Sequence, residues 1–192
     1  MVDATSALAG HMTPGDYGAQ GARAVTLSEV SAMSLVHIAG DGNGAAAVLG
    51  VELPGNAGGV AVSGGVRALW LGPDTWLVKA PVAEFGEWAG RIATALPNAA
   101  VNDVTHGRVT IRLEGPSARD VLAAGCPLDL HERAFAPGHA AASLLGHFNV
   151  LIECLGPEPS PDTFEVTVTR SYGRDLLSWL ERAAAEFGYR IV

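Results

Sequence analysis

Length and charge exclude several classes of protein at the outset. The chain has 192 residues, enough for one large domain or two small ones that bury a core without a disulfide or a metal. Its net charge of −8, from 12 Lys and Arg against 20 Asp and Glu, argues against nucleic acid and anionic membrane surfaces as partners. Only 17 % of the residues are charged and 48 % are hydrophobic, so the chain is either an unusually apolar monomer or a subunit whose partners cover part of its surface.

The N-terminal half is predicted to begin with a flexible arm and to continue as a βαββαβ-type unit. Residues 1–22 are small and polar, with Gly and Pro and no hydrophobic period, which is typical of an arm that orders only against a partner. The elements that follow are strands at 25–27 and 34–38, a helix at 45–49, strands at 68–71 and 75–78, a helix within 82–96 with Phe85, Trp88, Ile92 and Leu96 on its apolar face, and a strand at 101–105.

The two middle strands of this half form a predicted hairpin. Gly72, Pro73 and Asp74 are turn residues, and they place Trp70 opposite Trp76 on one face of the sheet. Apolar residues also line the other face, so both faces are predicted to be covered. The two indoles either pack under the following helix or anchor a partner.

The C-terminal half is predicted to repeat the same order of elements. Arg108–Glu114 alternates cleanly, so Ile111 is expected in the core, while Arg108 and Thr110 are expected on a polar face. The other elements are a helix from Pro116 to Gly125, strands at 142–145 and 150–154, a surface loop at 156–161, a half-buried strand at 164–169 and an edge strand at 189–192. A last helix is predicted from about Tyr172, with an apolar face of Leu176, Leu177, Leu180, Ala184 and Phe187.

The order of elements predicts an α+β fold of two split βαββαβ-type units, with antiparallel-rich sheets and packed helices. A shift of 73 positions aligns Val36 and Ile38 with Val109 and Ile111, in keeping with an internal repeat. The predicted organisation is an arm at 1–22 and units at 23–105 and 106–192, which together form one compact fold.

No residue pattern specifies a reaction, a cofactor or a metal. A dinucleotide fingerprint that begins with Gly40 and Gly42 would need a glycine where the chain has Ala45, and it would need a suitable acid about twenty residues further on. Both are missing, so Gly40–Gly44 is predicted to be a turn. Cys126 and Cys154 have no metal-ligand spacing and no marked catalytic base, and they are predicted to be small buried residues of a reduced protein. With no signal peptide and no long apolar run, a cytoplasmic location is expected. We therefore assign no catalytic, cofactor-binding or metal-binding residue.

Six residues are candidates for a subunit interface. His106 and Arg108 border Gly107 in a connection predicted to be a tight hairpin with a positive φ, or else a partner contact. Arg170 and Arg174 flank Ser171, a predicted helix cap, and cations at a helix start point to an acidic partner residue or to solvent. The complete set of interface candidates is Trp70, Trp76, His106, Arg108, Arg170 and Arg174.

Several motifs resemble a known family. The segment 101–118 resembles the D-x-S and G-P-x-A pattern of the aminomethyltransferase-like, folate-binding fold, with Thr105 in place of the usual serine. More specific is G-C-P-L-D-L-H at 125–131, followed by R-A-F-x-P-G at 133–138. With L-W-L-G-P-D-x-W-L at 69–77 and Arg-Ser-Tyr at 170–172, residues 25–188 resemble the gamma subunit of heterotetrameric sarcosine oxidase.

The resemblance implies a small non-catalytic subunit of a cytoplasmic bacterial complex. Such a complex demethylates sarcosine oxidatively to glycine, transfers the one-carbon unit to tetrahydrofolate and releases hydrogen peroxide. Its partners would be large alpha and beta flavoprotein subunits and a small delta subunit, which between them hold FAD, FMN, NAD, tetrahydrofolate and zinc. Two alternatives stay open: an equivalent subunit of a related N-methyl amino acid oxidase or dehydrogenase, and a free-standing folate-binding or assembly protein.

Overall fold

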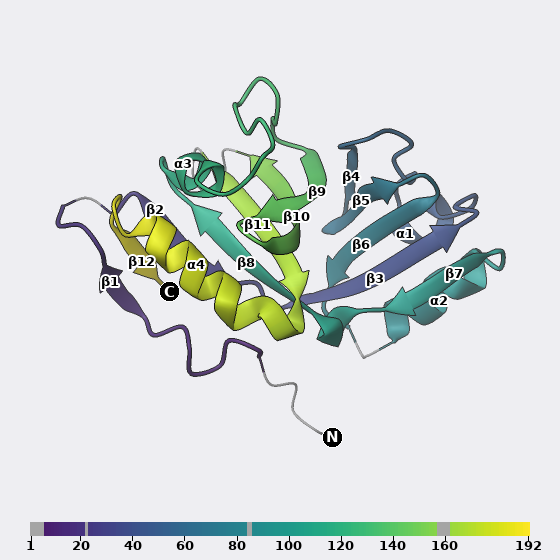
Figure 1. Cartoon of the computed structure of the whole chain (residues 1–192). Helices are drawn as coiled ribbons and strands as arrows, with labels where there is room; N and C mark the ends of the chain where they lie inside the picture. The colour runs from purple at the N-terminus through teal and green to yellow at the C-terminus, as the bar shows by residue number, and fades with distance from the viewer. Residues whose placement is uncertain (1–5, 22, 84–85, 157–161) are drawn as a thin grey trace. The chain divides into compact units, whose positions relative to one another are not determined.

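A computed structural model describes residues 6–21, 23–83, 86–156 and 162–192 (Figure 1). The described chain packs as two compact units that do not follow the order of the sequence. Unit 1 is built from Met1–Ser31, Val109–Pro137 and Ala142–Val192, and unit 2 from Ala32–Arg108 and Gly138–Ala141. The predicted α+β class with antiparallel-rich sheets is confirmed. The predicted arm at 1–22 and the predicted units at 23–105 and 106–192 stay a proposal.

Unit 2 is a five-stranded sheet in the order β4-β5-β6-β3-β7 with two helices. Strand β3 pairs antiparallel with both β6 and β7. The helices contact each other and contribute apolar residues to one core. The elements are β3 (Met33–Gly40), α1 (Ala46–Leu49), β4 (Val60–Ser63), β5 (Val66–Gly72), β6 (Thr75–Pro81), α2 (Glu87–Ala95) and β7 (Ala99–Asp103).

The predicted tryptophan hairpin is confirmed in unit 2. Trp70 of β5 lies opposite Trp76 of β6 in the register of the antiparallel pair. Trp76 belongs to the core that contains Ile92 of α2 and Leu96 just after it, and the partly buried Trp70 packs against this core. The strands are covered on both faces, because Leu69 on the opposite face is also fully buried. Phe85, predicted for the apolar face of the helix, lies outside the described residues.

The hairpin predicted around Gly107 is wrong. Thr105–Gly107 form a short 3₁₀ turn, and β7 and β8 belong to different sheets. The side chain of Thr105 accepts a hydrogen bond from the backbone N–H of Leu35 at 2.9 Å, and Asp103 accepts one from the N–H of Thr105 at 2.9 Å. The first of these bonds ties the connection to β3, and the second holds Asp103 and Thr105 in a local turn.

Unit 1 is a seven-stranded sheet in the order β1-β12-β2-β8-β11-β10-β9. Helix α4 lies along one face of this sheet and contacts α3 (Figure 1). Its buried residues Leu176, Leu177, Leu180 and Ala184 confirm the predicted apolar face. The elements are β1 (Gly15–Tyr17), β2 (Val25–Glu29), β8 (Arg108–Glu114), α3 (Ala118–Ala123), β9 (His139–Leu145), β10 (Phe148–Gly156), β11 (Thr163–Thr169), α4 (Gly173–Ala184) and β12 (Tyr189–Ile191).

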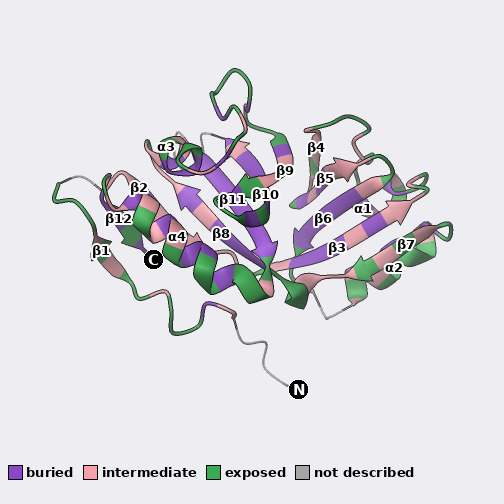
Figure 2. Ribbon diagram, in the orientation of Figure 1, coloured by how far each residue is buried: buried purple, intermediate pink, exposed green. Residues whose placement is uncertain are grey.

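Strand β11 is buried on both faces and β8 is partly buried on its polar face, whereas alternation predicted one polar, solvent-facing side for each (Figure 2). Ile111 is fully buried as predicted, but Thr110 is only 5 % exposed. The hydroxyl of Thr110 shares a hydrogen bond of 2.9 Å with that of Thr167. Arg112 donates to the fully buried Glu165 at 2.8 Å. The polar residues of β8 and β11 therefore pair with each other across the two neighbouring strands.

The arm and the C-terminal strand also differ from expectation. Strand β12 was predicted at the edge of a sheet, but it lies between β1 and β2 and runs parallel to β2. The edge is β1, which comes from the predicted arm and pairs antiparallel with β12. Leu8 is 1 % exposed, and the rings of Tyr17 and Tyr189 stack at 5.3 Å. Residues 6–17 are thus held by unit 1 of the chain itself.

The predicted repeat is confirmed as an order of elements, with one extra strand in each copy. The first runs β3-α1-β4-β5-β6-α2-β7, and the second runs β8-α3-β9-β10-β11-α4-β12. In both units the first strand lies beside the last strand of a three-stranded meander. Within the described residues, no helix has the length and apolar character needed to cross a membrane.

Candidate interaction site

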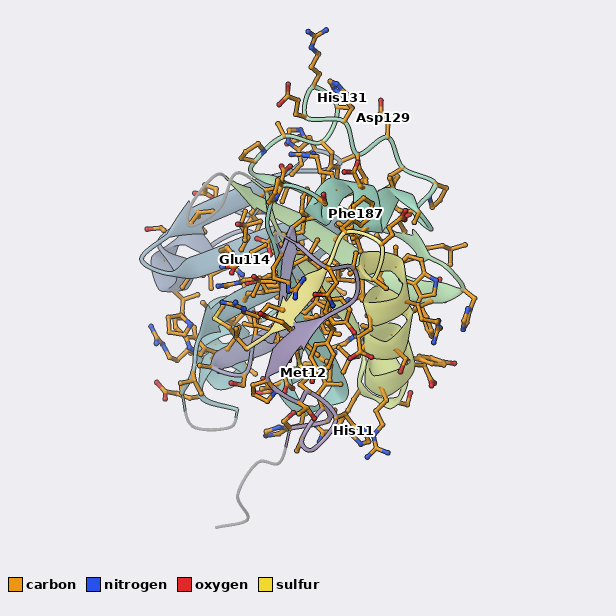
Figure 3. All side chains as sticks on the ribbon, turned by 90° about the vertical axis from the view of Figure 1, so that its left-hand side faces the viewer. His11, Met12, Glu114, Asp129, His131 and Phe187 are labelled. Carbon is orange, nitrogen blue, oxygen red and sulfur yellow. The ribbon has the colours of Figure 1, made fainter. Side chains whose placement is uncertain are left out.

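A long loop between α3 and β9 carries the most specific motif of the chain. It runs from Ala124 to Gly138 and contains the G-C-P-L-D-L-H sequence. Loops of this length without helix or strand are uncommon in compact units, and those that are ordered are often functional. Figure 3 shows Asp129 and His131 at its outer end, away from the helix and the sheet.

Arg119 on α3 anchors this loop from inside. Its guanidinium pairs with Asp162 at 2.6 Å and donates to the backbone carbonyls of Leu130 and Phe135, the latter at 3.1 Å. It also lies 4.9 Å from the ring centre of Phe164 and donates to the sulfur of Cys154 at 3.8 Å. Nε faces Asp162 while Nη1 donates to both carbonyls, so the planar guanidinium holds the carboxylate and the loop in one fixed geometry, which the single nitrogen of a lysine does not provide.

The first glycine of the motif seats the indole of Trp179. A Cβ on Gly125 would lie 2.4 Å from the Trp179 ring and 2.9 Å from the backbone nitrogen of Gly146. The carbonyl of Gly125 accepts a hydrogen bond of 2.9 Å from that same N–H of Gly146. The start of the loop is therefore clamped between the β9–β10 turn and α4, and only glycine leaves room for this.

The outer end of the loop is a tight local turn. Asp129 accepts the backbone N–H of His131 at 2.9 Å, and Nδ1 of His131 accepts the N–H of Arg133 at 3.2 Å. The side chains of all three residues are exposed. This turn is preorganised by its own hydrogen bonds, so contacts made by its side chains would carry little ordering cost.

Below the turn lies an open pocket of about 510 Å³ in unit 1. Its apolar lining comes from α3 and the motif itself, and its charged lining comes mainly from acidic residues. The lining residues are Arg119, Asp120, Ala123, Cys126, Leu128, Asp129, Leu130, His131, Glu132 and Asp162.

The thiols of this region are placed as core residues. Cys126 is 8 % exposed, and its sulfur lies 3.7 Å from the hydroxyl of Ser143. Burial raises the pKa of the Cys154 thiol, an effect that the charge of Arg119 opposes. Neither cysteine forms a disulfide. Among the described residues, no group of three or more His, Cys, Asp or Glu is arranged to hold a metal ion.

The predicted interface residues fall in both units. Trp70 is partly buried, and Trp76 is 7 % exposed with its indole N–H donating to the carbonyl of Pro54 at 2.8 Å. His106 lies in the 3₁₀ turn and Arg108 at the exposed start of β8. The structure therefore brings the two tryptophans together at one core, and it places His106 and Arg108 at the connection between β7 and β8.

Arg170 and Arg174 flank the start of α4. Arg170 lies in the 3₁₀ turn Arg170–Tyr172, and Arg174 is exposed in the first turn of the helix. The predicted capping role of Ser171 is wrong, because Tyr172 occupies the N-cap position and no side chain caps the helix. The 3₁₀ turn satisfies this helix start through its backbone instead.

Sequence reasoning missed Arg119 and Asp162. Arg119 is three residues before the buried Leu122, so helical spacing places its charge beside the apolar stripe of α3. A charged residue at that position was the feature of the sequence that could have identified Arg119. No feature of the sequence identified Asp162, since it lies more than forty residues away along the chain and only the fold brings it to Arg119.

The fold defined by these units is that of aminomethyltransferases. The glycine cleavage system aminomethyltransferase T from Bartonella henselae superposes with a TM-score of 0.65 at 18 % identity, covering 88 % of this chain and 48 % of that one. A chain of the heterotetrameric sarcosine oxidase from Corynebacterium sp. U-96 superposes with a TM-score of 0.82 at 32 % identity, covering 94 % and 92 %.

Sequence comparisons identify the family. The model of the sarcosine oxidase, gamma subunit family matches residues 37–186, so the chain belongs to this family. The sarcosine oxidase subunit gamma of Arthrobacter sp. is 37 % identical over 74 % of this chain and 68 % of that protein. That of Corynebacterium sp. (strain P-1) is 35 % identical over 88 % and 85 %.

Proposed function

We propose that this chain is the gamma subunit of a heterotetrameric sarcosine oxidase and that it has a structural, non-catalytic role. The complex oxidatively demethylates sarcosine to glycine, passes the one-carbon unit to tetrahydrofolate and releases hydrogen peroxide. The observation that carries the proposal is the match of nearly the whole chain, in sequence and in structure, to a subunit of such an oxidase.

The structural role is supported by what the charged residues do. Arg119 holds the motif loop, Arg112 neutralises the buried Glu165, and Asp103 fixes the turn after β7. Each of these side chains completes a contact within its own unit. Such contacts build a rigid surface for a partner, which is what an assembly subunit has to supply.

The partners in this proposal are large alpha and beta flavoprotein subunits and a small delta subunit. They would hold FAD, FMN, NAD, tetrahydrofolate and zinc, and the complex would be cytoplasmic, as its reduced cysteines favour. The candidate contacts on this chain are those predicted from the sequence, Trp70, Trp76, His106, Arg108, Arg170 and Arg174. Of these, the exposed His106, Arg108 and Arg174 are the best placed to reach a partner.

The test is purification of the tagged chain, alone and together with its partners from the source organism. We expect the lone chain to be colourless and inactive on sarcosine. The co-purified assembly should contain larger subunits, absorb at flavin wavelengths and release peroxide with sarcosine. An assembly that oxidises another N-methyl amino acid in preference to sarcosine would point to a related oxidase. Tetrahydrofolate binding by a lone chain without partners would replace the proposal with the free-standing folate-binding alternative.

A further inference from the structure

The motif loop and α3 form a pocket with an apolar floor and a charged rim. The floor is made by Ala123, Leu128 and the buried Cys126 and Leu130. At about 510 Å³ the pocket is large enough to take a long side chain together with part of its backbone. An apolar floor under a polar rim is the environment in which a long charged side chain buries its methylene stem and keeps its head in contact with polar groups.

The charges around the pocket are not balanced. Arg119 and Asp162 pair with each other, so they contribute little net charge. That leaves Asp120, Asp129 and Glu132, and among the described residues none of these three carboxylates has a cationic partner. The neighbouring Arg133 does not line the pocket. Three carboxylates around a concave apolar surface attract a cation and repel an anion, which sets the sign of the occupant.

The rim is also held in place before any partner arrives. Asp129 is fixed by its bond to the N–H of His131, and the floor residue Leu130 is held through its carbonyl by Arg119. A rigid acidic rim loses little conformational entropy when a partner binds, so more of the electrostatic attraction contributes to the binding free energy.

We propose that this pocket receives an arginine or lysine side chain of a partner subunit, with the methylene stem on the apolar floor and the cationic head among Asp120, Asp129 and Glu132. The inference rests on the proposed function, because it requires a partner subunit. It gives the loop from Ala124 to Gly138 a specific task, which is to present an acidic pocket to that partner.

The test compares tagged variants co-expressed with the partner subunits and pulled down at several salt concentrations. Asp129→Asn with Glu132→Gln removes two rim charges but keeps the acceptor that fixes the turn. Glu52→Gln with Glu186→Gln is the control, since it makes the same charge change at two exposed acids outside the pocket. We expect the rim variant to retain at least tenfold less partner at about 0.15 M salt, and the difference from the control to shrink at about 1 M salt, where exposed charges are screened.

A second pair of variants tests the floor. Ala123→Leu fills part of the pocket from the last residue of α3, whereas Ala124→Leu adds the same volume at the next residue, which is equally exposed but does not line the pocket. Only the first should weaken retention of the partner. Equal retention by the rim variant and its control, with no effect of Ala123→Leu, would overturn the inference and leave the subunit assignment intact. A wild-type chain that recovers no partner would overturn both.

Discussion

Replacing Arg119 tests the physical argument for the motif loop most directly. Arg119→Ala removes the ion pair to Asp162, whose side chains are 17 % and 19 % exposed, and this partial exposure limits the loss to about 1–3 kcal/mol. The carbonyls of Leu130 and Phe135 lose a charged donor, at about 1 kcal/mol each. The expected destabilisation is therefore about 3–5 kcal/mol.

Urea unfolding followed by tryptophan fluorescence measures this change. With an m-value of about 2 kcal/mol/M, the midpoint should fall by about 1.5–2.5 M. Arg133→Ala, in the same loop but exposed, should change stability by less than about 0.5 kcal/mol. Arg119→Lys should fall between them, because an ammonium can keep the charge near Asp162 but cannot reach both carbonyls. If Arg119→Ala and Arg133→Ala differ by less than about 1 kcal/mol, the loop does not depend on this anchor.

Three further outcomes follow from the same structure. Gly125→Ala should lower the stability of the protein by about 1–3 kcal/mol, because its methyl group would lie 2.4 Å from Trp179. Gly90→Ala on α2, with open space around it, should be neutral or stabilising in the same unfolding assay. Equal effects would mean that the indole moves aside freely. Ile111→Ala should cost about 2–5 kcal/mol and Thr110→Ala about 1–3 kcal/mol, since Thr110 is buried and bonded to Thr167; a cost near zero for Thr110→Ala would show that this bond contributes nothing. The hydrogen bond and charge of Arg190 hold the pKa of Asp16 below its ordinary value of 3.8, so the ionised carboxyl stabilises the fold above that pH. The difference in stability between wild type and Asp16→Asn should therefore close as the pH falls through the lowered pKa. A difference that persists in acid would show that the charge of Asp16 is not its source.

Local patterns in the sequence predict most of the elements. The tryptophan hairpin and the buried stripes of α2 and α4 appear where apolar spacing places them, because such spacing depends only on neighbours along the chain. The alternation of β8 correctly predicts that Ile111 is buried. The motif at 125–131 identifies the region that forms the pocket, although its sequence does not show that Arg119 holds the loop.

The errors have a common physical cause. Alternating polar and apolar residues give the same sequence pattern whether the polar ones face solvent or pair with each other. Only the pairing of β8 with β11 decides that Thr110 and Glu165 are buried. Likewise, a short C-terminal strand carries no sign that residues from the other end of the chain will cover it, as β1 covers β12.

The sequence by itself determined the class of fold, the order of elements and the family, because these depend on periodicity, turn residues and local motifs. The tertiary structure alone decided how the halves of the chain are distributed between two sheets and which charges are buried. It also decided that Arg119, Asp162 and the loop carbonyls meet at one point. Those outcomes depend on contacts between residues far apart in the chain, and the free energy of such contacts exists only once the backbone has brought the partners together.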